Sequence, residues 1–494
     1  MMSAPADRAF VRPEGRRWIL AAAILASALG FIDGTVVAIA MPALRADLGA
    51  TLDQATWIQN AYMVTLSALI LTGGAFGDRF GLAKVFGLGI GLFIITSLIC
   101  AVAPNASTLI LARGAQGIGA ALMVPGSLSL IARAYPRAER GRAIGIWAAA
   151  SSMTTALGPI IGGLALSLGG DTMWRWIFAI NLPLGLIAIW MLWANVQRDE
   201  GRPGEKIDLI GAGLATLGLG LMAWALTGAE GGVGSVWSLV FGAAGIAVIV
   251  AFLRYEASIP HAMLPLRLFM DRGFAATNLA TFALYFGLTA ILFFLPMLTI
   301  GAWGISEIEA AAALAPLSIA IFLFGSRFGR LGDQIGAGKL IALGSLVCAV
   351  AYTWLGFSVQ SGRYWAGVLP PMMLGGIGMS MLVAPLSAAV MGLALDKETG
   401  AASGVNNAVS RIAGLFAVAA MATLAGSIYR AAGGEFSFGL PRDSATHEAA
   451  SIAAFSAVSW ACAALAFLSA VIAATSIHYK PEKITPAASP DPAP

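Results

Sequence analysis

The sequence has few charged residues. Asp, Glu, Lys and Arg make up 11% of its 494 residues, whereas soluble proteins carry about 25%. Apolar residues reach 59%, and the mean hydropathy is +0.83. This composition excludes a soluble globular protein. It also excludes a largely disordered chain, because disorder requires low hydrophobicity. The composition therefore indicates an integral membrane protein.

Cysteine and histidine are scarce, with three residues of each. Cys100, Cys348 and Cys462 fall inside apolar runs, and their spacing fits neither a disulfide framework nor a metal site. The histidines lie far apart and outside those runs. We therefore expect packed thiols, no metal and no bound cofactor.

Motifs of common catalytic sites are missing as well. The one Gly-Lys pair, Gly338–Lys339, precedes Leu340 and so lacks the Ser or Thr of a phosphate-binding loop. Neither Gly-x-Ser-x-Gly nor His-Glu-x-x-His occurs. The sequence predicts neither an enzyme nor a nucleotide-driven pump.

Long apolar runs dominate the chain instead. A bilayer core needs about 20 apolar residues per helix, and fourteen runs meet this requirement. The sequence therefore predicts an all-α polytopic membrane protein. We place the spans near 18–40, 56–77, 85–103, 108–131, 141–168, 176–194, 209–227, 236–253, 273–300, 308–326, 339–358, 367–391, 400–425 and 451–477.

The basic residues set the orientation of these spans, since Lys and Arg gather in cytoplasmic loops. With both termini cytoplasmic, 22 of the 29 basic residues fall on the cytoplasmic side and five on the other. We expect a multi-pass protein of the inner (plasma) membrane with both termini in the cytoplasm. The net charge of +4 then reflects this bias and indicates no nucleic-acid partner.

Two cytoplasmic loops repeat one another. "GAFGDRFGLAKVFGLG" from Gly74 and "GRLGDQIGAGKLIALG" from Gly329 match at seven of sixteen positions, and "QGIGAALMVP" is echoed by "GGIGMSMLVAP". Spans 1–6 therefore correspond to spans 9–14, which is the parallel-repeat plan of a rocking transporter with a site between its halves. The predicted division is an N-terminal tail (1–17), a six-helix half (18–200), two inserted helices (201–260), a second six-helix half (261–477) and a disordered cytoplasmic tail (478–494).

Five motifs carry a family resemblance: "GAFGDRFGLAK", "LILARGAQGIGAALMVPGS", "ALGPIIGG", "GFIDGTVVAIAMP" and "MWRWIFAINLPLG". In this order they resemble the major facilitator superfamily, and within it the 14-helix drug:proton antiporters. The resemblance implies a secondary active transporter that exports amphipathic drugs, toxic compounds or metabolites by alternating access, with the proton gradient as its energy source. It also implies a monomer, with periplasmic adaptor proteins as optional partners. The loop motif departs from the family where Leu82 and Ala83 replace basic residues.

The resemblance also names candidate gate and bending residues. In the family the loop aspartate, here Asp78, holds the cytoplasmic gate shut against a helix of the other half, here span 13. A tight loop with a solvated charge pair is the simpler interpretation. Gly158–Pro159 in span 5 removes one backbone hydrogen bond and permits a bend, although an ordinary proline kink would look the same. The candidates are Gly74, Gly77, Asp78, Arg79, Gly81, Lys84 and Asp333 in the loops, and Gly158, Pro159, Gly162 and Gly163 in span 5.

Two charges lie inside the spans of the first half. Asp33 is about 22 Å along span 1 and Arg113 about 8 Å into span 4, so both fall in the outer half of the membrane. A lone charge at such depth is costly, and pairing is expected. The pair can be purely structural. Alternatively, Asp33 exchanges protons, because burial raises and a guanidinium lowers the pKa of a carboxyl group.

Further polar and aromatic residues are candidates for a substrate cavity. Ser403, Asn407 and Arg411 form one stripe on span 13, which serves either interhelical hydrogen bonds or a cavity wall. Trp and Tyr near the start of span 2 are also typical of the membrane interface, and helix packing accounts equally well for many Phe and Met residues. The predicted lining is Trp57, Asn60, Tyr62, Phe282, Phe286, Met379, Asn406, Asn407 and Arg411.

Other functions compete with proton-coupled export. Proton-coupled symport and narrow-specificity metabolite export use the same fold. A channel fits the residue content but not the two-half repeat, and a non-transporting receptor or scaffold would also keep the fold. The sequence leaves the identity and charge of the substrate open.

Overall fold

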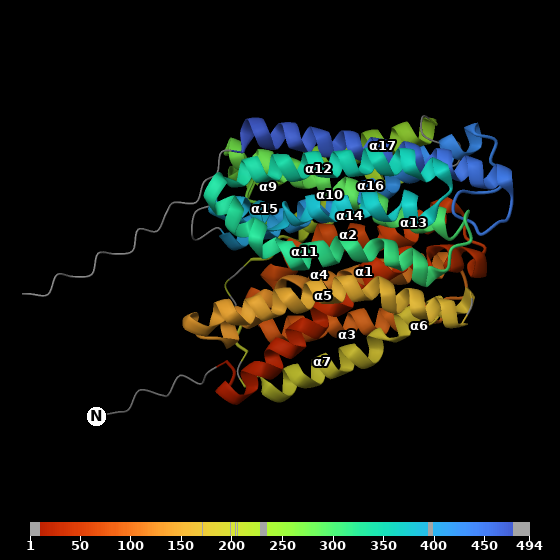
Figure 1. Ribbon diagram of the computed structural model, residues 1–494. Coiled ribbons are helices and arrows are strands. Elements are labelled where there is room, and N and C mark those ends of the chain that lie inside the picture. The colour runs from red at the N-terminus through yellow and green to blue at the C-terminus, as the bar shows by residue number, and fades with distance from the viewer. Residues whose placement is uncertain are drawn as a thin grey trace, which may run out of the picture.

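The computed structural model describes residues 10–169, 171–197, 199–202, 204, 206–227, 235–393 and 399–477 (Figure 1). Within these residues the regular elements are helices, apart from a single antiparallel bridge between Val11 and Val196. The helices are η1 (Pro13–Gly15), α1 (Arg16–Leu48), α2 (Leu52–Phe80), α3 (Leu82–Ala101), α4 (Ala106–Ala134), α5 (Arg137–Gly169), η2 (Asp171–Met173), α6 (Trp174–Ala179), α7 (Asn181–Asn195), α8 (Leu209–Thr227), α9 (Val236–Ser258), η3 (Leu266–Met270), α10 (Arg272–Thr299), α11 (Glu307–Ile335), α12 (Ala337–Ser358), η4 (Val359–Ser361), α13 (Tyr364–Gly367), α14 (Leu369–Ser380), α15 (Val383–Gly392), α16 (Thr399–Ala431) and α17 (Ala445–Ser476).

The predicted all-helical membrane fold is confirmed. Thirteen helical segments of the described chain are long and apolar enough to cross a membrane. The remaining predicted span is α5, a helix of 33 residues that contains the shorter apolar stretch Gly158–Ser167 and runs beside α11 (Figure 1). Two spans are interrupted near Pro183 and Pro385, because proline cannot donate to the carbonyl four residues earlier.

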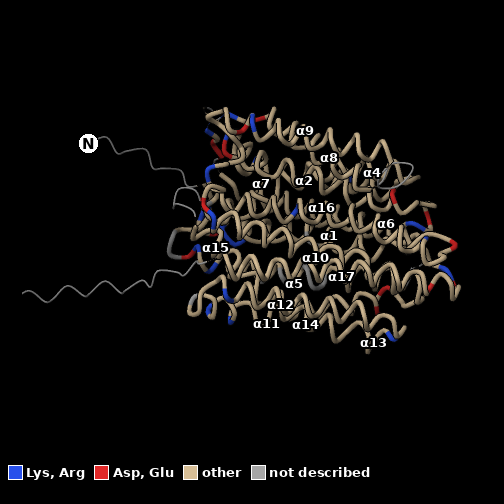
Figure 2. Tube along the Cα trace, turned by 90° about the horizontal axis from the view of Figure 1, so that it is seen from above, with Lys and Arg blue, Asp and Glu red and all other residues tan. Residues whose placement is uncertain are grey.

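Both described ends of the chain lie at the same end of the bundle. Gln197 donates its backbone N–H to Phe10, which places the N-terminal segment beside the end of α7. Ile477 packs against Gly338 at the start of α12. Figure 2 shows that Lys and Arg gather at this end, so we call it the basic end and the other the opposite end. Apolar helix surfaces lie between the two charged ends, as a lipid environment requires.

The predicted repeat has a counterpart in the backbone. Gly81 and Gly336 occupy matching positions between α2–α3 and α11–α12, with φ of 110° and 98°, which is a region favoured by glycine. A Cβ on Gly89 would lie 2.9 Å from the Gly119 carbonyl oxygen, and a Cβ on Gly344 would lie 2.9 Å from that of Gly378. The same close helix crossing therefore occurs once in each half.

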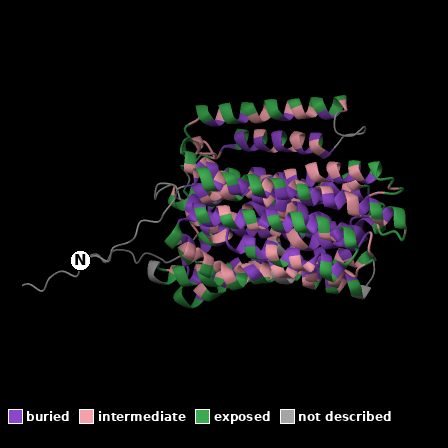
Figure 3. Cartoon of the chain, turned by 45° about the horizontal axis from the view of Figure 1, so that its top comes forward, coloured by how far each residue is buried: buried purple, intermediate pink, exposed green. Residues whose placement is uncertain are grey.

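The inserted helices α8 and α9 lie at the edge of the bundle. α8 packs against α2 and α16, with the rings of Trp57 and Trp224 5.5 Å apart. α9 packs against α8, and its outer face is exposed (Figure 3). The hairpin formed by α8 and α9 thus contacts both halves through α8.

Candidate functional site

A cavity of about 1200 Å³ lies between the two halves. Its walls come from α1, α2, α4 and α5 on one side and from α10 and α16 on the other. It is also lined by Asp78, Lys206, His261 and Gly400, which belong to segments at the basic end. The cavity therefore extends from the interior of the bundle to the basic end.

The opposite end is closed by contacts between the halves. Gly163 of α5 packs against the backbone of Glu307 at the start of α11, where a Cβ would come within 2.6 Å of the carbonyl oxygen. Ser167 donates to Glu307 at 3.2 Å and accepts from the backbone N–H of Ile308 at 3.3 Å. Arg45 of α1 donates to the carbonyl of Phe438 and, at 2.8 Å, to the hydroxyl of Ser437, both between α16 and α17. Among the described residues, the cavity therefore opens toward the basic end, and the contacts above close the opposite end.

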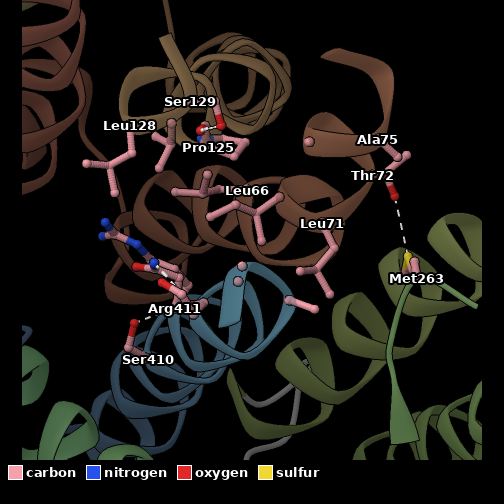
Figure 4. Close-up of a pocket in the computed structure, with 18 of the residues that line it drawn as sticks. Leu66, Leu71, Thr72, Ala75, Pro125, Leu128, Ser129, Met263, Ser410 and Arg411 are labelled. Atoms are coloured by element: carbon pink, nitrogen blue, oxygen red, sulfur yellow. Dashed lines mark hydrogen bonds between the residues drawn. The ribbon is translucent and has the colours of Figure 1, made fainter. Parts of the chain in front are cut away.

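The cavity has an apolar wall and a polar wall (Figure 4). Leu66 and Leu71 of α2 point inward, together with Pro125 and Leu128 of α4. The facing polar groups come from α16 and include Ser403, Asn407, Ser410 and Arg411. An amphipathic compound could place its apolar part against α2 and α4 and its polar group against α16.

Arg411 is the charged group on the polar wall. It lies within electrostatic range of Tyr62 and Tyr285, which also line the cavity. Its Nε atom is buried without a hydrogen-bond partner. The four ion pairs formed by the described side chains do not include it. The cavity therefore holds a cation that no carboxylate of the described chain neutralises directly.

The two predicted membrane charges are in contact. Arg113 Nη1 lies 2.5 Å from Asp33 Oδ2, and both side chains have no exposed surface. Arg113 also donates from Nε to the carbonyl of Ile58 at 3.2 Å. Its guanidinium stacks over the ring of Tyr62 at 4.4 Å. Removing one partner of a buried ion pair is costly because the other charge is left uncompensated.

A polar network that the sequence analysis missed surrounds this pair. Gln116, one helical turn after Arg113, donates to Asp33 Oδ1 at 3.1 Å and accepts from Arg113 at 2.6 Å. It also donates to Ser97 at 3.3 Å, and Asn181 donates to Ser97 at 2.8 Å. Arg113 and Gln116 are three residues apart in "RGAQG", and residues at this spacing are neighbours on a helix. This spacing could have predicted that Gln116 contacts the ion pair.

Tyr62 separates this network from the cavity. The tyrosine lines the cavity and also faces the Arg113 guanidinium. Gly30, one turn before Asp33 on α1, lines the cavity as well. Asp33 and Arg113 are not among the lining residues of this conformation. The ion pair is therefore one side chain away from the cavity.

Several predicted lining residues lie elsewhere in this conformation. Tyr62, Asn407 and Arg411 line the cavity, whereas six others are placed outside its lining. Those six pack against other helices or bond to them. Trp57 packs on Trp224; Asn60 is fully buried; Phe282 packs against Phe286 and Phe416; Met379 belongs to the apolar core; and Asn406 donates to Asn278 and Thr281 at 3.2 and 2.9 Å.

The first loop motif is held by an acidic residue that the sequence analysis did not identify. Asp199 Oδ2 accepts the backbone N–H of Lys84 at 2.8 Å. It also lies directly against Gly81, where a Cβ would come within 2.6 Å. Asp199 Oδ1 is 3.5 Å from Arg133 Nη1 of α4. This carboxylate thus ties the motif to the segment that follows α7.

The other residues of the loop motifs lie in different surroundings. Gly74 and Asp78 line the cavity, and the Asp78 carbonyl accepts the Arg202 N–H at 2.8 Å. Gly77 accepts the N–H of Gly81, and the Arg79 guanidinium lies over the Phe80 ring. The predicted contact of Asp78 with span 13, now α16, stays a prediction. The side chain of Asp333 lies outside the described part of the structure.

The glycines of span 5 allow close packing on two sides. α5 continues through Pro159 as one helix. A Cβ on Gly158 would lie 2.8 Å from Thr35 Oγ1, and one on Gly162 would overlap Val36, both on α1. The next residue, Gly163, faces α11 of the other half. The motif therefore joins the helix that carries Asp33 to the contact closing the opposite end.

The chain matches known proteins over most of its length. The model of the Major Facilitator Superfamily matches residues 23–418. A methylenomycin A resistance protein of Bacillus subtilis is 34% identical over 80% of this chain and 85% of its own length. A methylenomycin A resistance protein of Streptomyces coelicolor is 32% identical over 84% of this chain and 88% of its own length. A solved bacterial homologue of the lysosomal transporter Spinster, in an inward-facing conformation, has a TM-score of 0.67 at 17% identity, covering 95% of this chain and all of its own.

Two helical halves around a cavity that opens at one end are typical of membrane transporters. The chain belongs to the major facilitator superfamily. It is a multi-pass membrane transporter for small molecules and not an enzyme, and its relatives include drug-resistance proteins.

Proposed function

We propose that the protein is a proton-coupled antiporter that exports amphipathic compounds across the inner membrane. The observation that carries the proposal is the buried Asp33–Arg113 pair, separated from the substrate cavity by Tyr62. An ionisable pair inside a membrane helix bundle is costly and is typical of proton pathways. The basic end would face the cytoplasm because Lys and Arg favour that side.

The proposed cycle uses the two conformations of the halves. In the conformation described, Arg113 stabilises the ionised form of Asp33 while substrate enters from the cytoplasm. When the halves rock and the opposite end opens, the substrate leaves. Asp33 then takes a proton from outside, and its attraction to Arg113 falls. The protonated transporter returns and releases the proton toward the cytoplasm past Tyr62.

The cavity also suggests a preferred substrate charge. Arg411 faces the cavity and forms no ion pair with the other described side chains, and a charge-assisted hydrogen bond to it is stronger than a neutral one. We propose that compounds with an anionic or strongly accepting group and an apolar body bind best. The names of the two methylenomycin A resistance relatives support export of a small organic compound.

Substrate-induced proton movement in inside-out vesicles tests the antiport. Vesicles with an acidic lumen receive methylenomycin A or one of a series of C12 compounds that end in a carboxylate, alcohol or amine. Antiport makes the lumen more alkaline as substrate enters, whereas symport moves protons and substrate in the same direction. Uncoupled flux would indicate a channel-like or facilitated mechanism.

Two substitutions on α1 sharpen this experiment. Asp33→Asn should abolish substrate-induced proton movement while the protein stays folded. Asp47→Asn is the matched control: it removes a carboxylate from the same helix, but one that pairs with Arg175 at the partly exposed opposite end, 3.1 Å away. Normal coupled export by Asp33→Asn at every pH would refute the assignment of Asp33.

A further inference from the structure

A second pair of carboxyl groups lies at the base of the inserted hairpin. Asp208 immediately precedes α8, and Glu256 lies in the last turn of α9. Their exposed fractions are 8% and 3%. Asp208 also lines the cavity near the basic end. The pair is therefore buried where the hairpin meets the cavity mouth.

Each carboxyl group has one oxygen bound by the backbone. Asp208 Oδ1 accepts the N–H of Gly211 at 2.7 Å, and Glu256 Oε2 accepts the N–H of Leu264 at 2.8 Å. The other oxygens, Asp208 Oδ2 and Glu256 Oε1, are buried, and no hydrogen bond of normal geometry reaches them from the described residues. Leaving such an oxygen without a donor is unfavourable.

The two oxygens without donors face the same point. Both lie directly over Gly211, and a Cβ at this position would overlap each of them. Two carboxylate oxygens are both acceptors, so they form a hydrogen bond only when one of them carries a proton. A protonated Glu256 would donate from Oε1 to Asp208 Oδ2, and all four carboxyl oxygens would then be satisfied.

No described cation forms an ion pair with either carboxyl group. The phenol of Tyr255 on α9 interacts with both carboxyl groups and is within hydrogen-bonding reach of Asp208, and it would add negative charge if it ionised. Lys206 on the preceding loop and His261 on the following loop line the cavity. Two like charges buried together disfavour double ionisation.

We propose that Asp208 and Glu256 bind one proton between them and form a second proton-binding site, separate from Asp33. The site connects both ends of the hairpin to the cavity. Glu256 holds the backbone of Leu264, and the adjacent Met263 lines the cavity and accepts a hydrogen bond from Thr72 of α2 at 3.4 Å. Loss of the proton would separate the carboxylates and release this segment. The proposal does not depend on antiport.

Infrared difference spectroscopy of the full-length protein in lipid nanodiscs tests the proposal, with spectra recorded between acidic and alkaline pH. The wild type should show a protonated-carboxyl C=O band that disappears on alkalinisation. The same band should be missing from both Glu256→Gln and Asp208→Asn, because the two groups share one proton. Glu139→Gln, which removes an exposed carboxyl at the basic end, should keep it.

The substitutions preserve the local hydrogen bonds. The Gln amide at position 256 supplies an N–H for Asp208 Oδ2 and an oxygen for Leu264, and Asn at position 208 offers the equivalent groups. A band that survives either substitution, or two separate bands each lost with one residue, would overturn the shared proton. Loss of the band on adding Na⁺ or Mg²⁺ at constant pH would show a metal-cation site instead and would equally overturn it.

Discussion

Gly163 of α5 and Glu307 of α11 meet backbone to backbone at the opposite end of the bundle, with room for no side chain between them. The contact joins the two halves across the cavity axis. Its neighbours Ser167 and Ile308 add a hydrogen bond. In the proposed cycle this contact would break when the opposite end opens, so it would affect the balance between the two conformations.

Gly163→Ala should therefore disfavour the closed opposite end. The added Cβ would lie 2.6 Å from the Glu307 carbonyl oxygen and 3.0 Å from Ala311 Cβ, and overpacking costs about 1–3 kcal/mol. We expect transport in vesicles to fall roughly tenfold, since about 1.4 kcal/mol corresponds to a factor of ten. Gly141→Ala on the same helix meets no atom within 4 Å and is the control. Equal rates for the two variants would contradict this role of the contact.

Arg113→Leu should destabilise the protein by about 3–5 kcal/mol, because it leaves Asp33 buried without a counter-charge. Asp33→Asn combined with Arg113→Leu should recover much of that loss, since no unpaired charge remains. Thermal unfolding in nanodiscs measures both. Arg175→Leu breaks a partly exposed pair and should cost only about 0–1 kcal/mol. No recovery in the double variant would show that Arg113 acts mainly through its other contacts.

Arg411→Gln should change which compounds are transported. Losing a charged hydrogen-bonding partner costs about 1.5–3 kcal/mol, so the KM for C12 carboxylates should rise roughly ten- to hundredfold. The KM for the matching C12 alcohol should change little. Arg411→Lys keeps the charge and should retain part of the preference. A parallel loss for carboxylate and alcohol would indicate a packing role instead.

Glu256→Gln should alter the pH dependence of stability. In the wild type, alkaline pH forces two negative charges together inside the hairpin base, so the melting temperature should fall as pH rises. Wild type and variant should melt alike below the pH at which an unfolded glutamate loses its proton. From there up to the pH at which the folded pair loses its proton, the wild type should become steadily less stable than the variant, because only unfolding releases the proton in this range. At higher pH the difference should stay constant. Parallel pH profiles for both proteins would contradict this expectation.

The sequence predicted the helices and the repeat well because both depend on strong local signals. Apolar runs fix the spans, and the glycines of the loop motifs recur at matching positions with positive φ at Gly81 and Gly336. The depth argument also brought Asp33 and Arg113 to the same level, and the structure places them in contact.

The cavity lining was less predictable, because it depends on how each helix is rotated about its axis. Asn406 and Asn407 are adjacent, yet one bonds to α10 and the other lines the cavity. The contacts of Asp199, Asp208 and Glu256 are made between segments far apart in the sequence or across a hairpin. No local pattern indicated which acidic residues would become buried.

The cavity has an electrical consequence. Water that fills the cavity from the basic end would carry the electrical potential of that side deep into the bundle. Most of the membrane voltage would then fall across the closed part of the protein between Tyr62 and the opposite end. Asp33 and Arg113 lie in this closed part, behind Tyr62 as seen from the cavity. A full membrane potential acts on one elementary charge with about 2.3 kcal/mol per 100 mV. In the proposed antiport cycle, the occupancy of Asp33 by a proton should therefore respond to voltage as well as to pH, and export should then depend on both components of the proton-motive force.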